Sequence, residues 1–174
     1  TCAGDGSNLP MWSENGPRNW DLWITYYGAA ERDVWADAGA ELYRRRAGGK
    51  FENLAWMYNH EPGIADALRR YDAVMVMDDD IVIDAPRLNR LFLLRAAHGL
   101  PALQPAFEPR GKVSHALTCA QPADRIRLGN FIEMTCPLFE RARLEAFLAV
   151  YDYNLKGWGA DWWFLTVLGC DRAE

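Results

Sequence analysis

Five consecutive apolar residues, Ala73 to Met77, run directly into three aspartates, Asp78 to Asp80, and a second apolar run follows at 81–83. An uninterrupted apolar run of this length predicts a strand buried on both faces, as in a parallel sheet covered by helices. Three adjacent carboxylates at the end of such a strand are costly, because burial and mutual repulsion both oppose their ionisation. A divalent cation would compensate this charge. The pattern therefore predicts a metal site first, and sugar or phosphate transfer second.

The size and composition of the chain point to one folded unit. Its 174 residues suit a single domain, 1–174, which could be truncated at one or both ends. Half of the residues are hydrophobic and a quarter are charged, which is typical of a globular protein. The formal net charge of −5 argues against a nucleic-acid-binding function. No apolar stretch approaches the ~20 residues of a transmembrane helix, and the four widely spaced cysteines predict free thiols in a reducing, cytoplasmic compartment.

Apolar spacing and turn residues predict strands that alternate with helices along the chain. The segment 1–6 is expected to be the end of a strand that runs into a turn, and further strands are expected at 21–27, 73–77, 100–107 and 131–134. Helices are expected from 51, from 64, over 84–99, over 144–151 and, after a glycine-rich turn at 157–159, up to Gly169. The basic run 44–46 is read as a solvated face or a loop edge, or else as a partner of phosphate. This alternation predicts an α/β layer fold with a mostly parallel sheet, in which ligands bind beyond the carboxyl ends of the strands, where the aspartates lie.

Alternation along an extended chain places Asp78 and Asp80 on one side of the strand end and Asp79 on the other. We expect Asp80 to bind the metal and Asp78 to lie near a nucleotide ribose or the metal itself. Asp79 is expected to face away or bond to backbone, and is counted with Asp78 in the nucleotide site. Mg²⁺ or Mn²⁺ suits such a site, because hard cations bind one or two carboxylates together with substrate phosphates and water. The alternative is an acidic turn that caps the next helix.

Two further carboxylates carry candidate chemistry. Asp161 follows the glycine-rich turn beside several indoles, where it could accept the proton of an acceptor hydroxyl, although plain helix capping explains it equally well. Glu133 lies inside an apolar run and therefore needs a partner, which is either Arg127 or a substrate. His115, in a loop-like stretch, is read either as solvent-exposed or as a contact to diphosphate or metal.

Small polar and aromatic side chains complete the candidate site. Asp5 and Ser7 follow the first expected strand and are positioned to meet a nucleotide, although turn formation alone would account for them. Trp158 and Trp162 lie in a crowded aromatic segment that suits either a corner of the core or a wall on which a sugar stacks. Together with Glu133, these two tryptophans are assigned to an acceptor pocket.

Several rival motifs are excluded, and one stays open. The Ala85-Pro86 pair breaks the pattern of an EF-hand loop, and the chain has neither a P-loop, nor a dinucleotide-binding fingerprint, nor a Gly-x-Ser-x-Gly turn. A haloacid-dehalogenase-type phosphohydrolase remains an alternative, because such enzymes also place Asp-x-Asp after a buried strand. That motif normally sits in the first strand of its domain, whereas two expected strands and two expected helices precede it here.

Several segments together resemble one family. They are Gly4-Asp5-Gly6-Ser7, Trp20-Asp21-Leu22, Tyr26-Tyr27-Gly28, Lys50-Phe51 with Trp56, Tyr71-Asp72, Asp78-Asp79-Asp80-Ile81, Gln104-Pro105-Ala106, Asn130-Phe131-Ile132-Glu133-Met134 with Pro137 and Phe139, and Gly157-Trp158-Gly159 with Asp161. Their order and spacing resemble a glycosyltransferase-like family of GT-A type known as domain of unknown function 707. The resemblance runs through nearly the whole chain.

The resemblance implies a GT-A-like, Rossmann-type three-layer sandwich and a metal-dependent glycosyltransferase that uses a nucleotide-sugar donor and a carbohydrate or other hydroxyl acceptor. By the same resemblance, Asp78 to Asp80 match the metal- and nucleotide-binding Asp-x-Asp, and Asp161 matches the catalytic base of inverting members. One departure is that no histidine follows His115, whereas GT-A enzymes usually complete the metal shell with a later histidine. Either a part beyond Glu174 is missing, or the metal is bound weakly or by another group. A catalytically inactive nucleotide-sugar-binding module therefore stays open.

Overall fold

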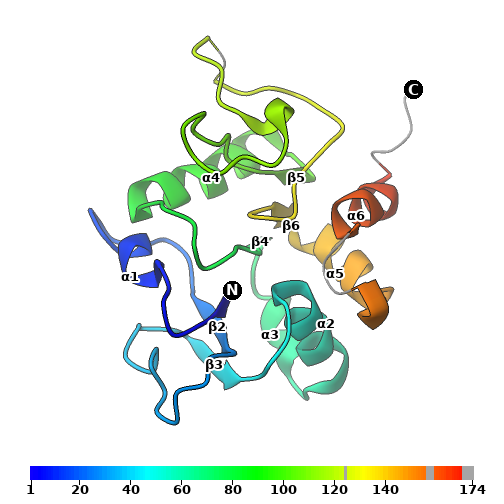
Figure 1. Ribbon diagram of the computed structural model, residues 1–174. Helices are drawn as coiled ribbons and strands as arrows, with labels where there is room; N and C mark the ends of the chain where they lie inside the picture. Colours follow the sequence, from blue (N-terminus) through cyan, green and yellow to red (C-terminus); the bar gives the residue numbers. More distant parts are fainter. Residues whose placement is uncertain (124, 156–158, 170–174) are drawn as a thin grey trace.

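The protein, described here by a computed structural model over residues 1–123, 125–155 and 159–169, contains two three-stranded sheets (Figure 1). In the first sheet, β1 (Cys2–Ala3), β2 (Trp23–Tyr26) and β3 (Leu42–Arg45) lie parallel in that order. In the second, β6 (Leu138–Glu140) lies between β4 (Ala73–Met75) and β5 (Ala102–Leu103) and runs antiparallel to both. The mixed α/β class is therefore confirmed, but the mostly parallel sheet is not: of the strands named here, β1, β2 and β3 pair in parallel and β4, β5 and β6 do not.

The direction of β6 follows from where the chain enters it. The helix α4 (Ala85–His98) connects β4 to β5 and returns the chain, so these two strands run in the same direction. The segment 104–137 then lies at the carboxyl ends of these strands, where the N–H of Asp78 donates to the carbonyl of Thr135 at 2.9 Å. Because β6 is entered from that end, it runs against both neighbours.

The two sheets meet along residues 76–78, which continue β4 toward the aspartates. Cys2 of β1 forms a parallel bridge with Asp78, and the Thr1 hydroxyl donates to the carbonyl of Met77 at 2.7 Å. On the opposite side, the N–H of Val76 donates to the carbonyl of Pro137 at 2.9 Å. The aspartates therefore lie at the carboxyl ends of both β1 and β4.

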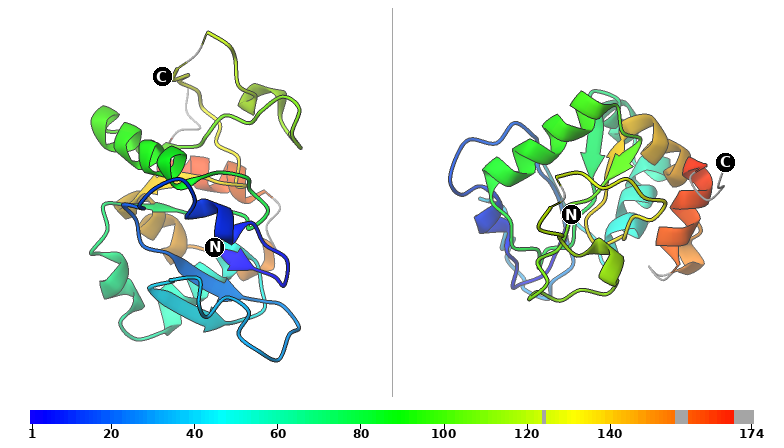
Figure 2. Two further views of the ribbon diagram at one scale, coloured as in Figure 1. Left: turned by 90° about the vertical axis from the view of Figure 1, so that its left-hand side faces the viewer. Right: turned by 90° about the horizontal axis from the view of Figure 1, so that it is seen from above.

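Alternate side chains of this extended segment enter two separate hydrophobic cores. Val76, 3% exposed, packs with residues of α2 (Lys50–His60), α3 (Ile64–Leu68), α5 (Arg141–Ala149) and α6 (Ala160–Leu168). Met77, 4% exposed, packs with residues of α1 (Leu9–Trp12) and α4. Figure 2 shows α4 on one side of the strands and α5 and α6 apart from it. The prediction of a segment buried from both faces is confirmed at these two residues.

Helix ends follow the local signals, whereas some strands do not. Asp84 caps α4 by accepting the N–H of Arg87 at 3.1 Å, and Gly99 ends the helix with φ 59°. The expected strand at 131–134 is wrong, because these residues form no strand pairing, and β3 and β6 lie where no strand is expected. The elements η1 (Ala116–Thr118) and η2 (Tyr153–Leu155) are short 3₁₀ helices. None of the helices in the described ranges has the length and apolar composition that crossing a bilayer requires.

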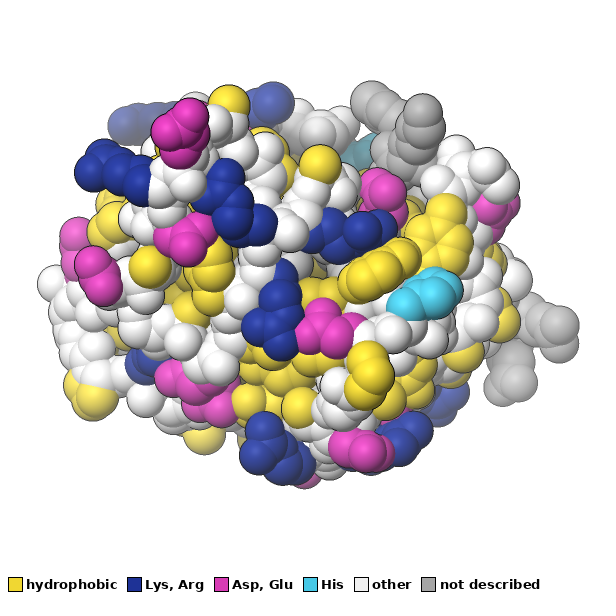
Figure 3. All heavy atoms as spheres, turned by 90° about the horizontal axis from the view of Figure 1, so that it is seen from below, with side chains coloured by type: hydrophobic (Ala, Val, Ile, Leu, Met, Phe, Trp, Pro, Cys, Tyr) yellow, Lys and Arg dark blue, Asp and Glu magenta, His cyan; other side chains and the backbone are white. Residues whose placement is uncertain are grey.

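The basic run 44–46 lies at the end of β3, on the edge of the parallel sheet. Arg44 pairs with Glu61 at 2.5 Å, and Arg45 pairs with Asp33 at 3.0 Å. Figure 3 shows acidic and basic side chains interspersed over the face of the molecule that is seen from below. Arg44 and Arg45 therefore belong to a solvated face in which their charges are paired, as the first of the sequence readings predicts, whereas Arg46 packs over the ring of Trp56.

Candidate functional site

The three aspartates at the sheet junction differ in what surrounds their carboxylates. Asp78 is 45% exposed and forms an ion pair of 2.6 Å with Lys50. Asp79 accepts the N–H of Gly4 at 2.9 Å, which matches the expected bond to backbone. Asp80 is exposed, and its carboxylate has no hydrogen bond or ion pair to any residue that the structure describes. Asp80 is thus the carboxylate of the three that is open to a ligand.

Lys50 supplies part of the compensating charge that the sequence analysis assigns to a cation. Its side chain is 5% exposed, and its ammonium also donates to the carbonyl of Thr135 at 2.8 Å. Burial lowers the pKa of Lys50, while the charge of Asp78 raises it. The sequence reasoning missed this residue. The signal that could have found it is the spacing of Lys50, Leu54 and Met57, which places a lysine on the apolar face of α2, where a charge needs a partner.

Tyr27 is a second residue that the sequence analysis did not assign. Partial burial raises the pKa of Tyr27, and the charge of Asp79 raises it next. The phenol lies beside Gly4, whose N–H donates to Asp79 at 2.9 Å. A Cβ added to Gly4 would lie 3.0 Å from the Tyr27 hydroxyl, so the absence of a side chain there leaves room for the ring. Tyr27 is 48% exposed. An exposed ring beside the carboxylates is available to stack on a base or a sugar.

The turn after β1 holds the two other candidates for the nucleotide site. Asp5 accepts a hydrogen bond from the hydroxyl of Tyr26, and a side chain at Gly28 would collide with both groups. The Ser7 hydroxyl donates to the carbonyl of Asp79 at 3.2 Å and accepts the first N–H of α1. These contacts show that Asp5 and Ser7 shape the turn, and that the turn lies directly against the aspartates.

Glu133 is 6% exposed, and hydroxyl groups satisfy its carboxylate. Thr135 donates to Oε1 at 2.8 Å and the Thr118 hydroxyl lies 3.4 Å from Oε2, while the backbone N–H of Glu133 donates to the side chain of Gln104. Arg127 donates instead to the carbonyls at 117 and 119. The Arg127 partner suggested by the sequence is therefore not the one found. Because Lys50 contacts both Thr135 and Asp78, Glu133 is connected to the aspartates through two intervening residues, Thr135 and Lys50.

A row of aromatic rings in edge-to-face and tilted contact lies next to Glu133. The ring centroids of His115 and Phe131 are 4.8 Å apart, and those of Phe131 and Trp162 are 5.3 Å apart. Trp162 is 63% exposed, so the row ends at the surface. The Thr118 hydroxyl that faces Glu133 also donates to the carbonyl of His115 at 2.7 Å. Glu133 and Trp162, both assigned to the acceptor pocket, thus belong to one group of packed residues, whereas Trp158 lies outside the described residues.

Asp161 lies in the first turn of α6, after the N-cap residue Gly159, which has φ 80°. Its carboxylate accepts the N–H of Trp162 at 3.1 Å. The residue is therefore not the N-cap that the alternative reading requires, although an acid in the first turn still complements the helix dipole. Within the described ranges, no hydrogen bond or ion pair joins Asp161 to the aspartates at 78–80, so the structure groups it with Trp162 and not with the nucleotide-site candidates.

The aspartates fit a cation only together with a ligand that brings its own oxygens. Among residues 1–123, 125–155 and 159–169, no group of three or more His, Cys, Asp or Glu side chains surrounds a common metal position. The carboxylate of Asp80 is open. In Asp78, the Lys50 ammonium contacts Oδ1 at 2.6 Å, and Oδ2 is left for a cation. Mg²⁺ and Mn²⁺ often bind one or two carboxylates and take the remaining oxygens from phosphates and water. Asp80 and Asp78 therefore suit a cation that arrives with a diphosphate.

Comparison of the chain with protein-family models, with curated proteins and with solved structures finds no match. The functional argument consequently rests on the chemistry of the site.

Proposed function

We propose that the chain is a nucleotide-sugar-binding domain of GT-A type that acts in metal-dependent glycosyl transfer. The observation that supports it is the grouping of three aspartates, the turn at 4–7 and the ring of Tyr27 at the carboxyl ends of β1, β2 and β4. In α/β folds this edge of the sheet is where ligands bind. An acidic edge repels a diphosphate, so a nucleotide diphosphate would bind there with a cation.

In the proposed chemistry, a bound cation and the side chains of the protein have separate roles. When bound at Asp80 and Asp78, Mg²⁺ or Mn²⁺ would neutralise the charge that develops on the leaving nucleotide diphosphate. Lys50 holds Asp78 in position through the ion pair, and Tyr27 offers its ring to the base or sugar of the donor. Asp161 accepts the proton of the acceptor hydroxyl, whose direct attack inverts the anomeric carbon.

The acceptor is proposed to bind beside Trp162 and Glu133. The exposed indole of Trp162 presents a flat apolar surface of the kind on which a sugar ring stacks. The Thr135 hydroxyl orients the Glu133 carboxylate by donating to Oε1, so that the remaining lone pairs can accept bonds from a hydroxylated acceptor. A carbohydrate or another hydroxyl compound fits this combination.

The layers around the sheet and the state of the cysteines also bear on this proposal. The separate cores on the two sides of Val76 and Met77, together with the bridge between Cys2 and Asp78, support a three-layer arrangement around a joined sheet. Cys2, Cys119 and Cys136 are free thiols, and burial raises the pKa of Cys136 to about 12. Free thiols are typical of a reducing compartment, in keeping with the proposed cytoplasmic location.

Two alternatives have specific observations in their favour. Lys50 places a cation beside Asp78, which is a chemistry that a haloacid-dehalogenase-type phosphohydrolase could use to hold phosphate against a nucleophilic carboxylate. Within the described residues, the lack of a group of three metal ligands would suit a module that binds nucleotide sugars without transferring them. Each alternative predicts a different substrate profile.

The proposal is tested by measuring hydrolysis of a panel of nucleotide sugars, with water as the acceptor, in the presence and absence of Mn²⁺. We expect release of nucleotide diphosphate that needs the metal and falls about 10²-fold or more in Asp161→Asn, because the general base is lost. Asp66→Asn, an exposed position on α3, is the matched control and should leave the rate unchanged. Cleavage of p-nitrophenyl phosphate without any turnover of nucleotide sugars would point to the phosphohydrolase instead. Saturable donor binding with no turnover would point to the inactive module.

A further inference from the structure

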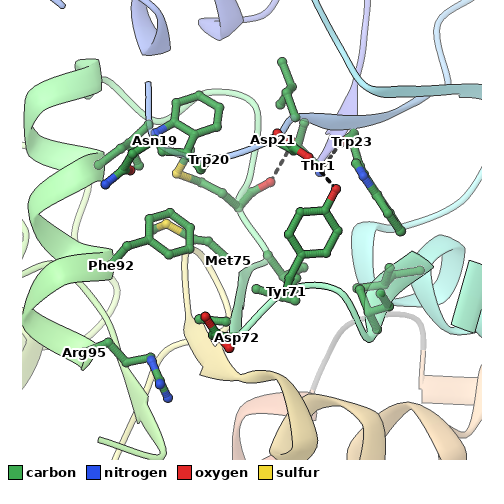
Figure 4. A pocket seen from close by; sticks show the side chains of 18 of the residues that line it. Thr1, Asn19, Trp20, Asp21, Trp23, Tyr71, Asp72, Met75, Phe92 and Arg95 are labelled. Carbon is green, nitrogen blue, oxygen red and sulfur yellow. Dashed lines mark hydrogen bonds between the residues drawn. The ribbon is translucent and has the colours of Figure 1, made fainter. Parts of the chain in front are cut away.

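The molecule has two apolar features besides its cores. Figure 4 shows the first, a cavity of about 380 Å³ with the rings of Trp20, Trp23 and Phe92 in its lining. This cavity reaches Thr1 and Lys50, so it adjoins the junction of the two sheets beside the aspartates. The second is the projecting loop, residues 107–123 and 125–130 between β5 and β6, which stands out from the layers of the molecule (Figures 1 and 2). The projecting loop exposes its apolar side chains to solvent.

Hydrogen bonds within the projecting loop give it a defined shape. Phe107 and Cys119 form a parallel bridge, in which the N–H of Phe107 donates to the carbonyl of Thr118 at 2.9 Å. The Arg127 guanidinium donates to the carbonyls of Leu117 and Cys119, and thereby ties the returning part of the loop to η1. The loop is therefore a folded projection that holds its exposed side chains in place.

Three large aliphatic side chains of the loop face the solvent. Leu128 is 81% exposed, Leu117 is 54% exposed and Ile126 is 41% exposed. Single exposed leucines are common on protein surfaces, whereas several on one projection mark a surface that meets something apolar. Because Arg127 binds the carbonyl of Leu117, the residues on either side of Arg127 lie next to η1. The three aliphatic side chains therefore form one group, here called the apolar tip.

Basic side chains accompany the apolar tip. Arg110, Lys112 and Arg125 are exposed, and none of them forms an ion pair within the part of the chain that the structure describes. The sequence 107–130 has four Lys or Arg residues against two Asp or Glu, although the whole chain has a net charge of −5. The molecule is thus a basic projection on an acidic body, a distribution that turns the loop toward a negatively charged surface.

We propose that the projecting loop docks on an anionic lipid membrane. The apolar tip enters the boundary between headgroups and acyl chains, where exposed aliphatic side chains leave water. Arg110, Lys112 and Arg125 lie at the lipid phosphates, where each cation adds to the attraction. The cytoplasmic leaflet carries the anionic lipids that such a surface recognises, in keeping with the proposed location.

A bilayer suits this surface better than a protein partner does. A stable protein–protein interface needs about 20–30 residues on each side, whereas the apolar tip consists of three side chains on a narrow projection. Membrane binding needs no complementary shape, because it combines apolar insertion with the attraction between cations and anionic headgroups. The proposal does not depend on glycosyl transfer, since neither the apolar tip nor the three cations are assigned to the donor or the acceptor.

The apolar tip is tested by flotation of the full chain with vesicles of phosphatidylcholine and phosphatidylserine. We expect binding that falls about tenfold or more in Ile126→Ser/Leu128→Ser, because less apolar surface enters the bilayer. Leu93→Ser/Val150→Ser removes two aliphatic side chains that are 61% and 53% exposed elsewhere, and should bind as the wild type does. Leu128→Trp should bind at least as tightly as the wild type, because indoles favour the membrane interface. All four positions are exposed, so Tm should change little in each variant.

The cations are tested in the same assay. We expect Arg110→Gln/Lys112→Gln to lose about tenfold or more in binding, and vesicles of phosphatidylcholine alone to bind little of the wild type. Arg32→Gln/Arg143→Gln removes the same charge at exposed positions outside the loop and should stay within about twofold of the wild type.

Equal binding by the loop variants and their controls would overturn the proposal, as would the absence of binding to the mixed vesicles. Retention of the protein on immobilised polyglutamate without vesicle binding would also overturn it, and would assign the loop to an acidic protein partner.

Discussion

At the scale of single residues, the three aspartates differ in the groups that contact their carboxylates. Asp78 has the Lys50 ammonium, Asp79 has the Gly4 N–H, and Asp80 is left open. The sequence predicted the acidic cluster and its position, because both follow from adjacent residues. It did not predict the roles of Lys50 and Tyr27, which reach the aspartates from α2 and from the end of β2, since only the tertiary fold brings them there.

Replacing Lys50 by methionine tests the balance at Asp78. Lys50→Met keeps an unbranched stem but removes the ammonium and its bonds to Asp78 and Thr135. We expect the free energy of unfolding to fall by about 1–3 kcal/mol, less than for a fully buried pair, because water reaches the half-exposed Asp78. Urea unfolding gives the value, with exposed Lys112→Met as the control, expected within about 0.5 kcal/mol of the wild type. Equal losses in the two variants would show that the ion pair does not stabilise the fold.

At the scale of elements, the helices were predictable and the sheet only partly so. The capping residue Asp84, the periodic apolar face and the terminal Gly99 are local signals, and α4 begins and ends where they indicate. The expected strand at 131–134 failed because the N–H of Glu133 bonds to a side chain, that of Gln104, and not to a neighbouring strand. β6 is only three residues long and depends on β4 and β5 on either side, which its own sequence does not reveal.

The cap of α4 gives a prediction at this scale. Asp84→Ala removes the acceptor for the Arg87 N–H, and we expect a loss of about 1 kcal/mol, or about 2–4 °C in Tm. Asp84→Asn keeps an acceptor oxygen and should retain most of the stability. The ion pair between Asp84 and Arg87 is lost in both variants and contributes little, since the Arg87 side chain is 73% exposed. Equal destabilisation by alanine and asparagine in thermal unfolding would mean that the charge, and not the cap, matters.

At the scale of the whole molecule, the junction of the two sheets positions the aspartates. The segment 73–78 leads into them, and Asp78 forms the bridge with Cys2 of β1 that joins the sheets. Side chains of this segment enter the cores on both of its faces, so the aspartates are left at its end. The sequence predicted the buried segment and the acidic end, whereas the junction arises from the pairing of strands that are distant in sequence.

The most direct test of the central claim is a calorimetric titration of nucleotide diphosphates into the protein with and without Mn²⁺. We expect saturable binding that requires the metal and weakens at least about tenfold, or about 1.4 kcal/mol, in Asp80→Asn. The exposed control Asp66→Asn should bind as the wild type does. Nucleotide binding that is unchanged without metal, or unchanged in Asp80→Asn, would contradict the account, as would the absence of any nucleotide binding.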